Sequence, residues 1–340
     1  MTAPTITREP TRRPLPERLV PYDAVDRRGF LAGGAGLATI TLLGACGESD
    51  DGGSRATERQ VRTDKGRVGV PVKVARVACA DFFGAFAVID LGLVPVAVSG
   101  SGYQDTGPTY APKLAKVPTV GDFTTPDPEK VAGTNPDLIL RTIDTADALY
   151  RQLTGIAPTV VVSFQRLSLT EVTSRVGDVL GRKTEADALL ATYRKRYGEI
   201  KTKHADVLDS HTFTFAQTAS DSTFWTLGEK WTDTKVLVDC GVRLAEPSAS
   251  QKDPTQEYSM ERIGVLERSD VLVIPAGPDG VTEAPDNKPL TRNALWRRLP
   301  AVRAGQVYPV PSGAASLGTA LELITRLDTV LTDVAATAGG

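Results

Sequence analysis

The stretch from Thr184 to Val207 constrains the fold most, because it carries one continuous apolar stripe at helical spacing. Charged residues occupy the opposite face, and the stripe consists of Ala186, Leu189, Leu190, Tyr193, Tyr197 and Ile200. We expect Thr184 to be the N-cap. The helix would reach roughly 36 Å, the size of a small domain. Short strands and helices alternate on both sides, so we predict a stiff helix joining two α/β lobes. An ordinary surface helix within one domain is the alternative.

Size and charge narrow the class of protein. The chain has 340 residues, 41% of them hydrophobic, which is enough for one large core or two modest ones. It carries 39 Lys and Arg against 41 Asp and Glu, a balance that does not indicate a nucleic-acid partner. The only histidines, His204 and His211, do not have metal-ligand spacing. Because HExxH, CxxC and a recognisable Ser-His-Asp order are also missing, we expect no enzyme and no metal site.

The N-terminus reads as an export and anchoring signal. Arg27 and Arg28 precede an apolar run, Leu31 to Ala45, that is too short for a stable spanning helix. The Arg pair resembles a twin-arginine signal, and Leu-Gly-Ala-Cys resembles a bacterial lipobox that ends at Cys46. Both motifs in order predict a signal peptide over 1–46 and a lipid on Cys46, with the protein held on the outer face of the cytoplasmic membrane. A core helix containing Cys46, or a secreted form without lipid, is the alternative.

The remaining chain divides into four parts. Residues 47–68 have almost no apolar content and are predicted to be a flexible tether. An N-terminal α/β lobe is expected over 69–167, a helical linker with the spine helix over 168–209, and a C-terminal α/β lobe over 210–340. Cys79 and Cys240 then fall in different lobes, so we expect two buried thiols, with a disulfide between them as the alternative.

Alternating strand and helix patterns in the first lobe predict a parallel sheet covered by helices. In open α/β sheets a ligand lies outside the carboxyl ends of the strands. This rule nominates the loops that begin at Cys79, Ser99, Gly121, Arg141 and Phe164.

Several phrases in a fixed order then resemble one family. In the first half they are VPTVG at 117–121, DPEKV at 127–131 and NPDLIL at 135–140; in the second half they are SMERI at 259–263, SDVLV at 269–273, and LWRRLPAV at 295–302 followed by GQVY at 305–308. The set is similar to the substrate-binding proteins of iron–siderophore and cobalamin importers. It covers about residues 72 to 335. The resemblance implies two Rossmann-like α/β lobes joined by a single long rigid helix, the class III substrate-binding fold.

The resemblance also implies a mechanism and partners. The ligand sits in a cleft between the lobes, and the loaded protein, a monomer, docks on an ABC permease with its ATPase. One acidic residue on each lobe engages the permease, and Glu129 and Glu261 occupy the matching positions. Each follows a helix start, so compensation of the positive helix end is an alternative role that is compatible with docking.

A ferric siderophore is the expected ligand. Arg141 follows a core strand and would bind siderophore oxygens bidentately. Aromatic loop residues would pack against flat ligand faces; the candidates are Tyr103, Phe123, Phe224, Trp225 and, more weakly, Tyr258. The siderophore already wraps its iron, so we expect no cofactor and no metal ligand from the chain. Cobalamin or haem is the alternative ligand, and an exported enzyme or cell-envelope interaction protein on this scaffold is the alternative of another class.

Overall fold

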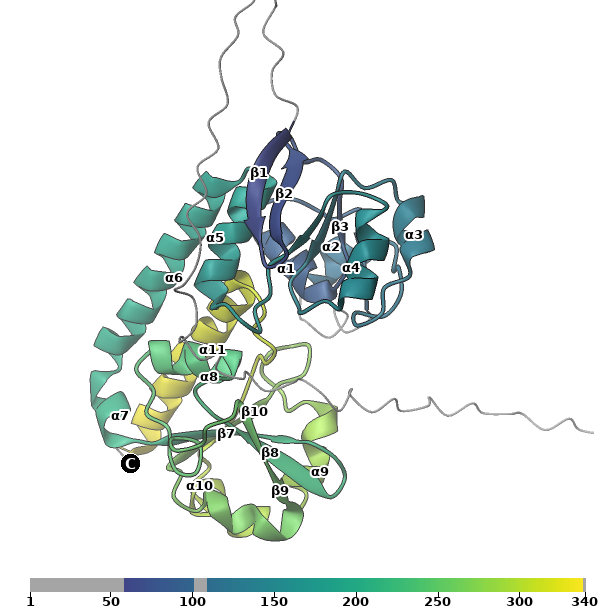
Figure 1. Cartoon of the computed structure of the whole chain (residues 1–340). Coiled ribbons are helices and arrows are strands. Elements are labelled where there is room, and N and C mark those ends of the chain that lie inside the picture. The colour runs from purple at the N-terminus through teal and green to yellow at the C-terminus, as the bar shows by residue number, and fades with distance from the viewer. Residues whose placement is uncertain (1–57, 101–108, 339–340) are drawn as a thin grey trace, which may run out of the picture.

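The computed structural model describes residues 58–100 and 109–338, which form two α/β lobes (Figure 1). The first lobe contains a parallel sheet with the strand order β4-β3-β5-β6. Its strands are β3 (Val77–Cys79), β4 (Ala97–Val98), β5 (Leu138–Arg141) and β6 (Thr159–Val161). Every residue of these strands is buried, as expected when helices cover both faces of a parallel sheet. The predicted parallel sheet of the first lobe is therefore confirmed.

Local start signals position the helices of the first lobe. These helices are α1 (Phe82–Asp90), α2 (Ala111–Leu114), α3 (Pro128–Gly133), α4 (Asp147–Thr154) and α5 (Leu169–Leu180). Asp81 caps α1 by accepting a hydrogen bond from the Gly84 N–H. Pro128 opens α3 at a position that needs no N–H donor, as its sequence predicted. Ser168 and Glu171 cap α5 reciprocally.

The predicted spine is α6 (Lys183–Lys203), a helix of 21 residues. Ala186, Leu190, Tyr193 and Ile200 are buried along it, so the apolar stripe is confirmed. The predicted ends are wrong. The helix starts one residue before Thr184, without a side-chain cap, and it ends before His204, where the short helix α7 (Ala205–Ser210) begins. At His204 the ring Nε2 lies 2.7 Å from a carboxylate oxygen of Asp328.

The second lobe contains a mixed sheet with the order β11-β10-β7-β8-β9. Its strands are β7 (Phe213–Thr218), β8 (Thr223–Leu227), β9 (Thr255–Ser259), β10 (Val271–Pro275) and β11 (Val307–Val310). Strands β7, β10 and β11 are parallel, whereas β8 and β9 add two antiparallel strands. Its helices and 3₁₀ turns are α8 (Thr232–Asp239), η2 (Met260–Leu266), η3 (Pro285–Asn287), α9 (Lys288–Thr291), η4 (Trp296–Arg298), α10 (Pro300–Arg303) and α11 (Leu317–Ala338).

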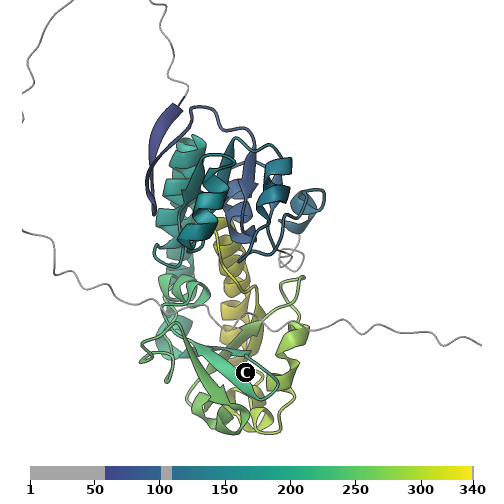
Figure 2. The ribbon, with the colours of Figure 1, turned by 45° about the vertical axis from the view of Figure 1, so that its right-hand side comes forward.

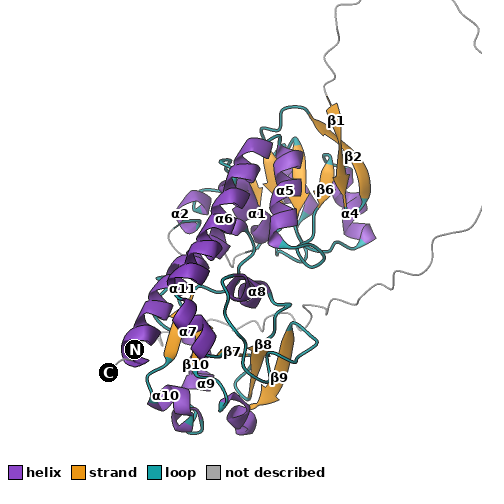
Figure 3. Ribbon diagram, turned by 90° about the vertical axis from the view of Figure 1, so that its left-hand side faces the viewer, coloured by secondary structure: helices purple, strands orange, loops and turns teal. Residues whose placement is uncertain are grey.

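Helix α11 runs beside α6 and also reaches from one lobe to the other (Figures 1 and 3). Between Leu317 and Val334, α11 contributes eight buried apolar side chains to the core of the second lobe. Leu190, Tyr193 and Ile200 of α6 belong to the same core. Its N-terminus touches the first lobe, because the Gly318 N–H donates to Asp90 at 2.8 Å. The fold class of two α/β lobes joined by a long helix is confirmed, and α11 accompanies that helix.

The segment before the first lobe is the main correction. Part of the predicted tether forms a β-hairpin of β1 (Glu58–Thr63) and β2 (Gly66–Pro71), which packs against α5 (Figures 1 and 2). The Arg59 guanidinium donates to the backbone carbonyls of Asp178 and Val179 at 2.5 and 2.7 Å. The flexible-tether prediction is therefore wrong for residues 58–68, and its remaining part, 47–57, lies outside the described residues. The sequence of residues 72–78 also predicts a strand, but in the structure only β3 (Val77–Cys79) is a strand there.

Both cysteines within the described residues are buried free thiols, which confirms the prediction for Cys79 and Cys240. Burial raises the pKa of both thiols, that of Cys240 to about 12, so both are unreactive near neutral pH. Of the helices in the described ranges, none has the length and apolar character needed to cross a bilayer.

Candidate aromatic site at the junction of the lobes

The carboxyl edges of the two sheets lie at the junction between the lobes. Phe164 follows β6 and packs against the cores of both lobes. In the same segment, Leu167 packs against the core of the first lobe, whereas Leu169 belongs to the core of the second lobe. Ala315, in the loop after β11, belongs to the first core. The loop after β6, one of those that the carboxyl-end rule nominates, thus meets the second lobe, and the loop after β11 meets the first.

Four phenylalanines form a connected group at this edge of the first sheet. Phe82 and Phe83 open α1 directly after β3, Phe123 lies in the loop after Val120, and Phe164 follows β6. Ring centroids of Phe83 lie 4.0 Å from Phe82, 5.9 Å from Phe123 and 5.1 Å from Phe164. All four side chains are half-buried, so they offer ring surface to a ligand. We call this group the aromatic platform.

Arg141 is hydrogen-bonded to the loops that carry the aromatic platform. It is 1% exposed, and its Nη1 donates to the carbonyls of Ala80 at 2.6 Å and Phe123 at 3.2 Å, while Nε donates to Thr145 at 2.8 Å. Burial lowers the pKa of Arg141, and the nearby carboxylate of Asp81 opposes that shift. The structure contradicts the prediction of an outward-pointing Arg141 that grips a ligand. The side chain instead ties three loops of the edge together.

The aromatic candidates of the second lobe do not lie on carboxyl-end loops. Phe224 is fully buried in the core below β8, so its prediction as a ligand contact is wrong. Tyr258 is half-buried on β9 and stacks on Phe224 at 5.6 Å between centroids. Trp225 is half-buried on the opposite face of β8, against the core that contains α6 and α11. The reason for the error is that residues 223–227 are a strand and not the predicted loop.

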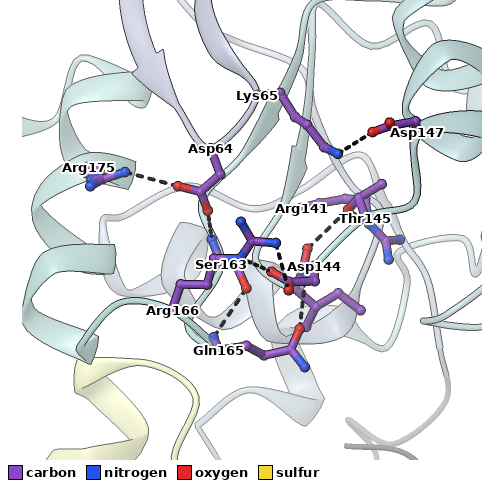
Figure 4. A network of polar contacts seen from close by, with 11 residues as sticks. Asp64, Lys65, Arg141, Asp144, Thr145, Asp147, Ser163, Gln165, Arg166 and Arg175 are labelled. Atoms are coloured by element: carbon purple, nitrogen blue, oxygen red, sulfur yellow. Dashed lines mark hydrogen bonds and ion pairs between the residues drawn. The ribbon is translucent and has the colours of Figure 1, made fainter. Parts of the chain in front are cut away.

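A polar network includes Ser163, Gln165 and Arg166 of the loop after β6 (Figure 4). Asp64, in the turn of the β1–β2 hairpin, accepts hydrogen bonds from the Ser163 N–H at 2.7 Å and from Arg175 at 3.1 Å. Next along the loop, Arg166 pairs with Asp144 through two bonds of 2.9 and 3.0 Å. The hydrogen bonds that Arg166 donates to the Asp144 carboxylate raise the pKa of Arg166, so the guanidinium is charged and already holds a carboxylate.

The two predicted docking carboxylates are exposed, one on each lobe. Glu129 lies in the first turn of α3, and Glu261 lies in the first turn of η2. A hydrogen bond with the side chain of Ser259 holds the pKa of Glu261 below its usual range, so this residue carries a full charge at neutral pH. Both residues also lie in the first turn of a helix, so compensation of the positive helix end remains an alternative role that is compatible with docking.

Sequence reasoning missed Phe82, Phe83 and Phe164. Each lies within a few residues of the carboxyl end of a strand, β3 or β6, and this position was the available signal. Tyr103, Cys46, Arg27 and Arg28 lie outside the described residues. A surface hollow of about 680 Å³ lies elsewhere, on α6 and α11, but its charged lining residues are already paired: Arg196 and Lys203 with Asp328, and Arg196 also with Glu199. Within the described residues, no group of three or more His, Cys, Asp or Glu is arranged to hold a metal.

Known proteins share this architecture. The chain is 27% identical over 298 residues to the iron(3+)-hydroxamate-binding protein YxeB of Bacillus subtilis, covering 83% of this chain and 89% of that protein. It is 24% identical over 292 residues to a putative ABC transporter substrate-binding lipoprotein, YhfQ, of the same organism, covering 82% and 89%. A siderophore periplasmic binding protein from the fuscachelin gene cluster of Thermobifida fusca superposes with a TM-score of 0.68 at 25% identity, covering 76% and 97%.

The periplasmic binding protein family matches residues 77–314, from the first strand of the parallel sheet to the loop before α11. The match therefore includes both sheets, the helix that joins them and the whole described platform. Proteins of this family bind a substrate for transport. This chain belongs to the periplasmic binding protein family.

Proposed function

We propose that this protein captures a ferric siderophore between its lobes and delivers it to an ABC permease, which works with its ATPase, for iron uptake. The observation that carries this proposal is the aromatic platform at the edge of the first sheet that faces the second lobe. Relatives named for binding iron–hydroxamate complexes support the ligand class. The iron arrives as cargo inside its chelator, so the protein acts as a binding protein and not as an enzyme.

Truncation of the platform tests capture. We expect Phe83→Ala to weaken the binding of a ferric siderophore by about ten- to a hundredfold, because Phe83 contacts the other three rings. Binding is measured by quenching of tryptophan fluorescence on the full chain in detergent, with ferric, iron-free and cobalamin ligands. Tyr197→Ala, which removes a half-buried ring from α6, is the matched control and is expected to leave affinity unchanged. A protein that binds no ferric siderophore does not have the proposed function.

Measurement of iron uptake by cells distinguishes delivery to the permease from capture of the siderophore. We propose that Glu129 and Glu261 engage basic residues of the permease, since each is exposed and charged on its own lobe. We expect Glu129→Ala and Glu261→Ala to lower iron uptake by about tenfold, as lost interfacial ion pairs do, without changing siderophore affinity. Radiolabelled iron uptake in cells that carry the cognate transporter is the measurement. Unchanged uptake by the double variant would reject these residues as docking contacts.

We also propose that Arg27 and Arg28 direct export and that a lipid on Cys46 holds the protein at the outer face of the cytoplasmic membrane. Relatives named as lipoproteins support the anchor. From the hairpin, the chain back to Cys46 covers 11 residues, 47–57. Cell fractionation of Cys46→Ser tests the anchor, and a variant that still sediments with membranes would contradict it.

A further inference from the structure

Gly100, in the loop after β4, lies in close contact with two residues of the aromatic platform. A Cβ added at this position would lie 2.8 Å from Cδ1 of Phe82 and 3.0 Å from Cβ of Phe123. Unbonded carbon atoms pack at about 3.5–4.0 Å, so neither distance leaves room for a methyl group. Phe82 and Phe123 therefore occupy space that any other residue at position 100 would need.

The backbone of Gly100 is held in this place by hydrogen bonds. Its N–H donates to the carbonyl of Gly121 at 2.8 Å, and the N–H of Ser99 donates to the carbonyl of Cys79 at 3.0 Å. Both bonds join the segment to the stretches of chain that carry the two rings. The φ angle of Gly100 is +96°, a conformation that glycine adopts without a steric penalty. Glycine is thus favoured at this position by conformation and also by space.

Of the two neighbours, only the Phe82 ring can give way to an added side chain. The backbone of Phe123 is fixed, because its carbonyl accepts a hydrogen bond from Arg141 at 3.2 Å. The Phe82 ring lies against Phe83, with 4.0 Å between centroids, and 5.8 Å from the core ring of Phe86. Because those rings occupy the inner side, a methyl group would push the Phe82 ring toward the open side of the platform.

The platform rings interlock, so that a shift of one ring affects the others. The interplanar angle is 75° between Phe82 and Phe123, 86° between Phe83 and Phe123, and 73° between Phe83 and Phe164. At these angles the edge of one ring meets the face of the next, an arrangement that depends on the distance between the rings. The surface that the four rings present to a ligand therefore depends on the space left at position 100.

We propose that Gly100 is a positioning residue of the ligand site: the missing side chain sets the arrangement of the platform rings and thereby the affinity for a ferric siderophore. This inference rests on the proposed function. Gly100 acts through Phe82 and Phe123, and the proposal requires no contact between Gly100 and the ligand.

The test compares two glycine variants of the full chain in detergent. Both are titrated with ferric desferrioxamine B, ferrichrome and ferric enterobactin, and binding is measured by quenching of tryptophan fluorescence. We expect Gly100→Ala to weaken the complexes that the natural protein binds by about tenfold. Gly92→Ala is the matched control: its φ is +81°, so it carries a comparable backbone cost, but its added Cβ would meet no atom within 4 Å. Gly92 lies beyond the opposite end of α1, and its variant should keep the affinity unchanged.

A double variant separates ring displacement from backbone strain. Once Phe82→Ala has removed the displaced ring, addition of Gly100→Ala should change the affinity by less than about twofold. An equal loss with and without the Phe82 ring would assign the effect to strain and overturn the proposal. If Gly100→Ala alone does not fold, thermal unfolding of the double variant decides, because removal of the ring should restore folding; a double variant that stays unfolded also overturns the proposal.

The titrations also distinguish this inference from the proposed function. A natural protein that binds a ferric siderophore, with a Gly100→Ala variant that binds it equally well, overturns the role of Gly100 alone. Failure of the natural protein to bind any ferric complex rejects the proposed function, and with it this inference.

Discussion

Replacement of Asp81 by Ala is expected to lower the free energy of unfolding by about 3–5 kcal/mol, the range for breaking a buried charged network. The Asp81 carboxylate is fully buried where β3 meets α1. One oxygen accepts from the Gly84 N–H at 2.7 Å and from the Thr142 hydroxyl at 2.8 Å, and the other accepts from the Thr142 N–H at 2.7 Å. Truncation leaves two buried backbone donors without partners.

Replacement of Asp81 is also expected to destabilise the protein through its effect on Arg141. The negative charge of Asp81 opposes the burial that lowers the pKa of that guanidinium, so its loss leaves a buried cation without its nearest counter-charge. Because Arg141 donates to the carbonyls of Ala80 and Phe123, the loops under the aromatic platform should loosen as well. Siderophore affinity is therefore expected to fall together with stability.

The control is a second Asp at the same kind of position. Asp127 caps α3 through its side chain but is only half-buried, so Asp127→Ala is expected to cost about 1 kcal/mol. Equilibrium unfolding in guanidinium chloride measures both variants. If the Asp81 variant is no less stable than the Asp127 variant, the buried network does not have the assigned role.

The core of this fold could be predicted from sequence where one pattern dominates. Four apolar residues at helical spacing in α6 have no polar competitor on their face, and the buried runs of β5 and β10 are bounded by turn residues. Strand β9 was missed because Tyr258 is the only apolar residue in Thr255–Ser259, so its sequence has no hydrophobic period, and β8 was missed because its short run Thr223–Leu227 was interpreted as part of a loop. The hairpin was missed because contacts with α5, such as those of Arg59, stabilise a charged segment.

The sequence predicts which edge of the first sheet carries the candidate site, but not which side chains lie there. The carboxyl-end rule selected the loops that contain Phe123 and Phe164 of the aromatic platform, and the role of Phe123 as a ligand contact stays a prediction. The inward direction of Arg141 could not be predicted, because its guanidinium donates to the carbonyls of Ala80 and Phe123, and both partners are distant from it in the sequence. Phe82 and Phe83 were not among the predicted ligand contacts, and their ring contacts with Phe123 and Phe164 show that they reach the edge.

Replacement of Gly318 by Ala is expected to detach the start of α11 from the first lobe and to cost about 2–4 kcal/mol, from overpacking and from lost bonds to a buried carboxylate. An added Cβ would lie 2.2 Å from a carboxylate oxygen of Asp90 and 2.2 Å from the hydroxyl of Tyr110. These groups are bonded to each other, since the Tyr110 hydroxyl donates to Asp90 at 2.7 Å and the Gly318 N–H donates at 2.8 Å. Burial raises the pKa of Asp90, and the hydrogen bonds from Tyr110 and Gly318 oppose that shift by stabilising the charged carboxylate.

The consequence reaches both lobes, because α11 carries buried side chains of the second core and begins against α1 of the first. Hydrogen exchange should accelerate in the first turn of α11 and around Tyr110, while the far end of the helix, near Val334, stays protected. Gly198→Ala is the matched control: its added Cβ meets no atom within 4 Å inside α6, so it should stabilise the protein by about 1 kcal/mol. A Gly318 variant that behaves like this control would show that α6 alone holds the lobes in place.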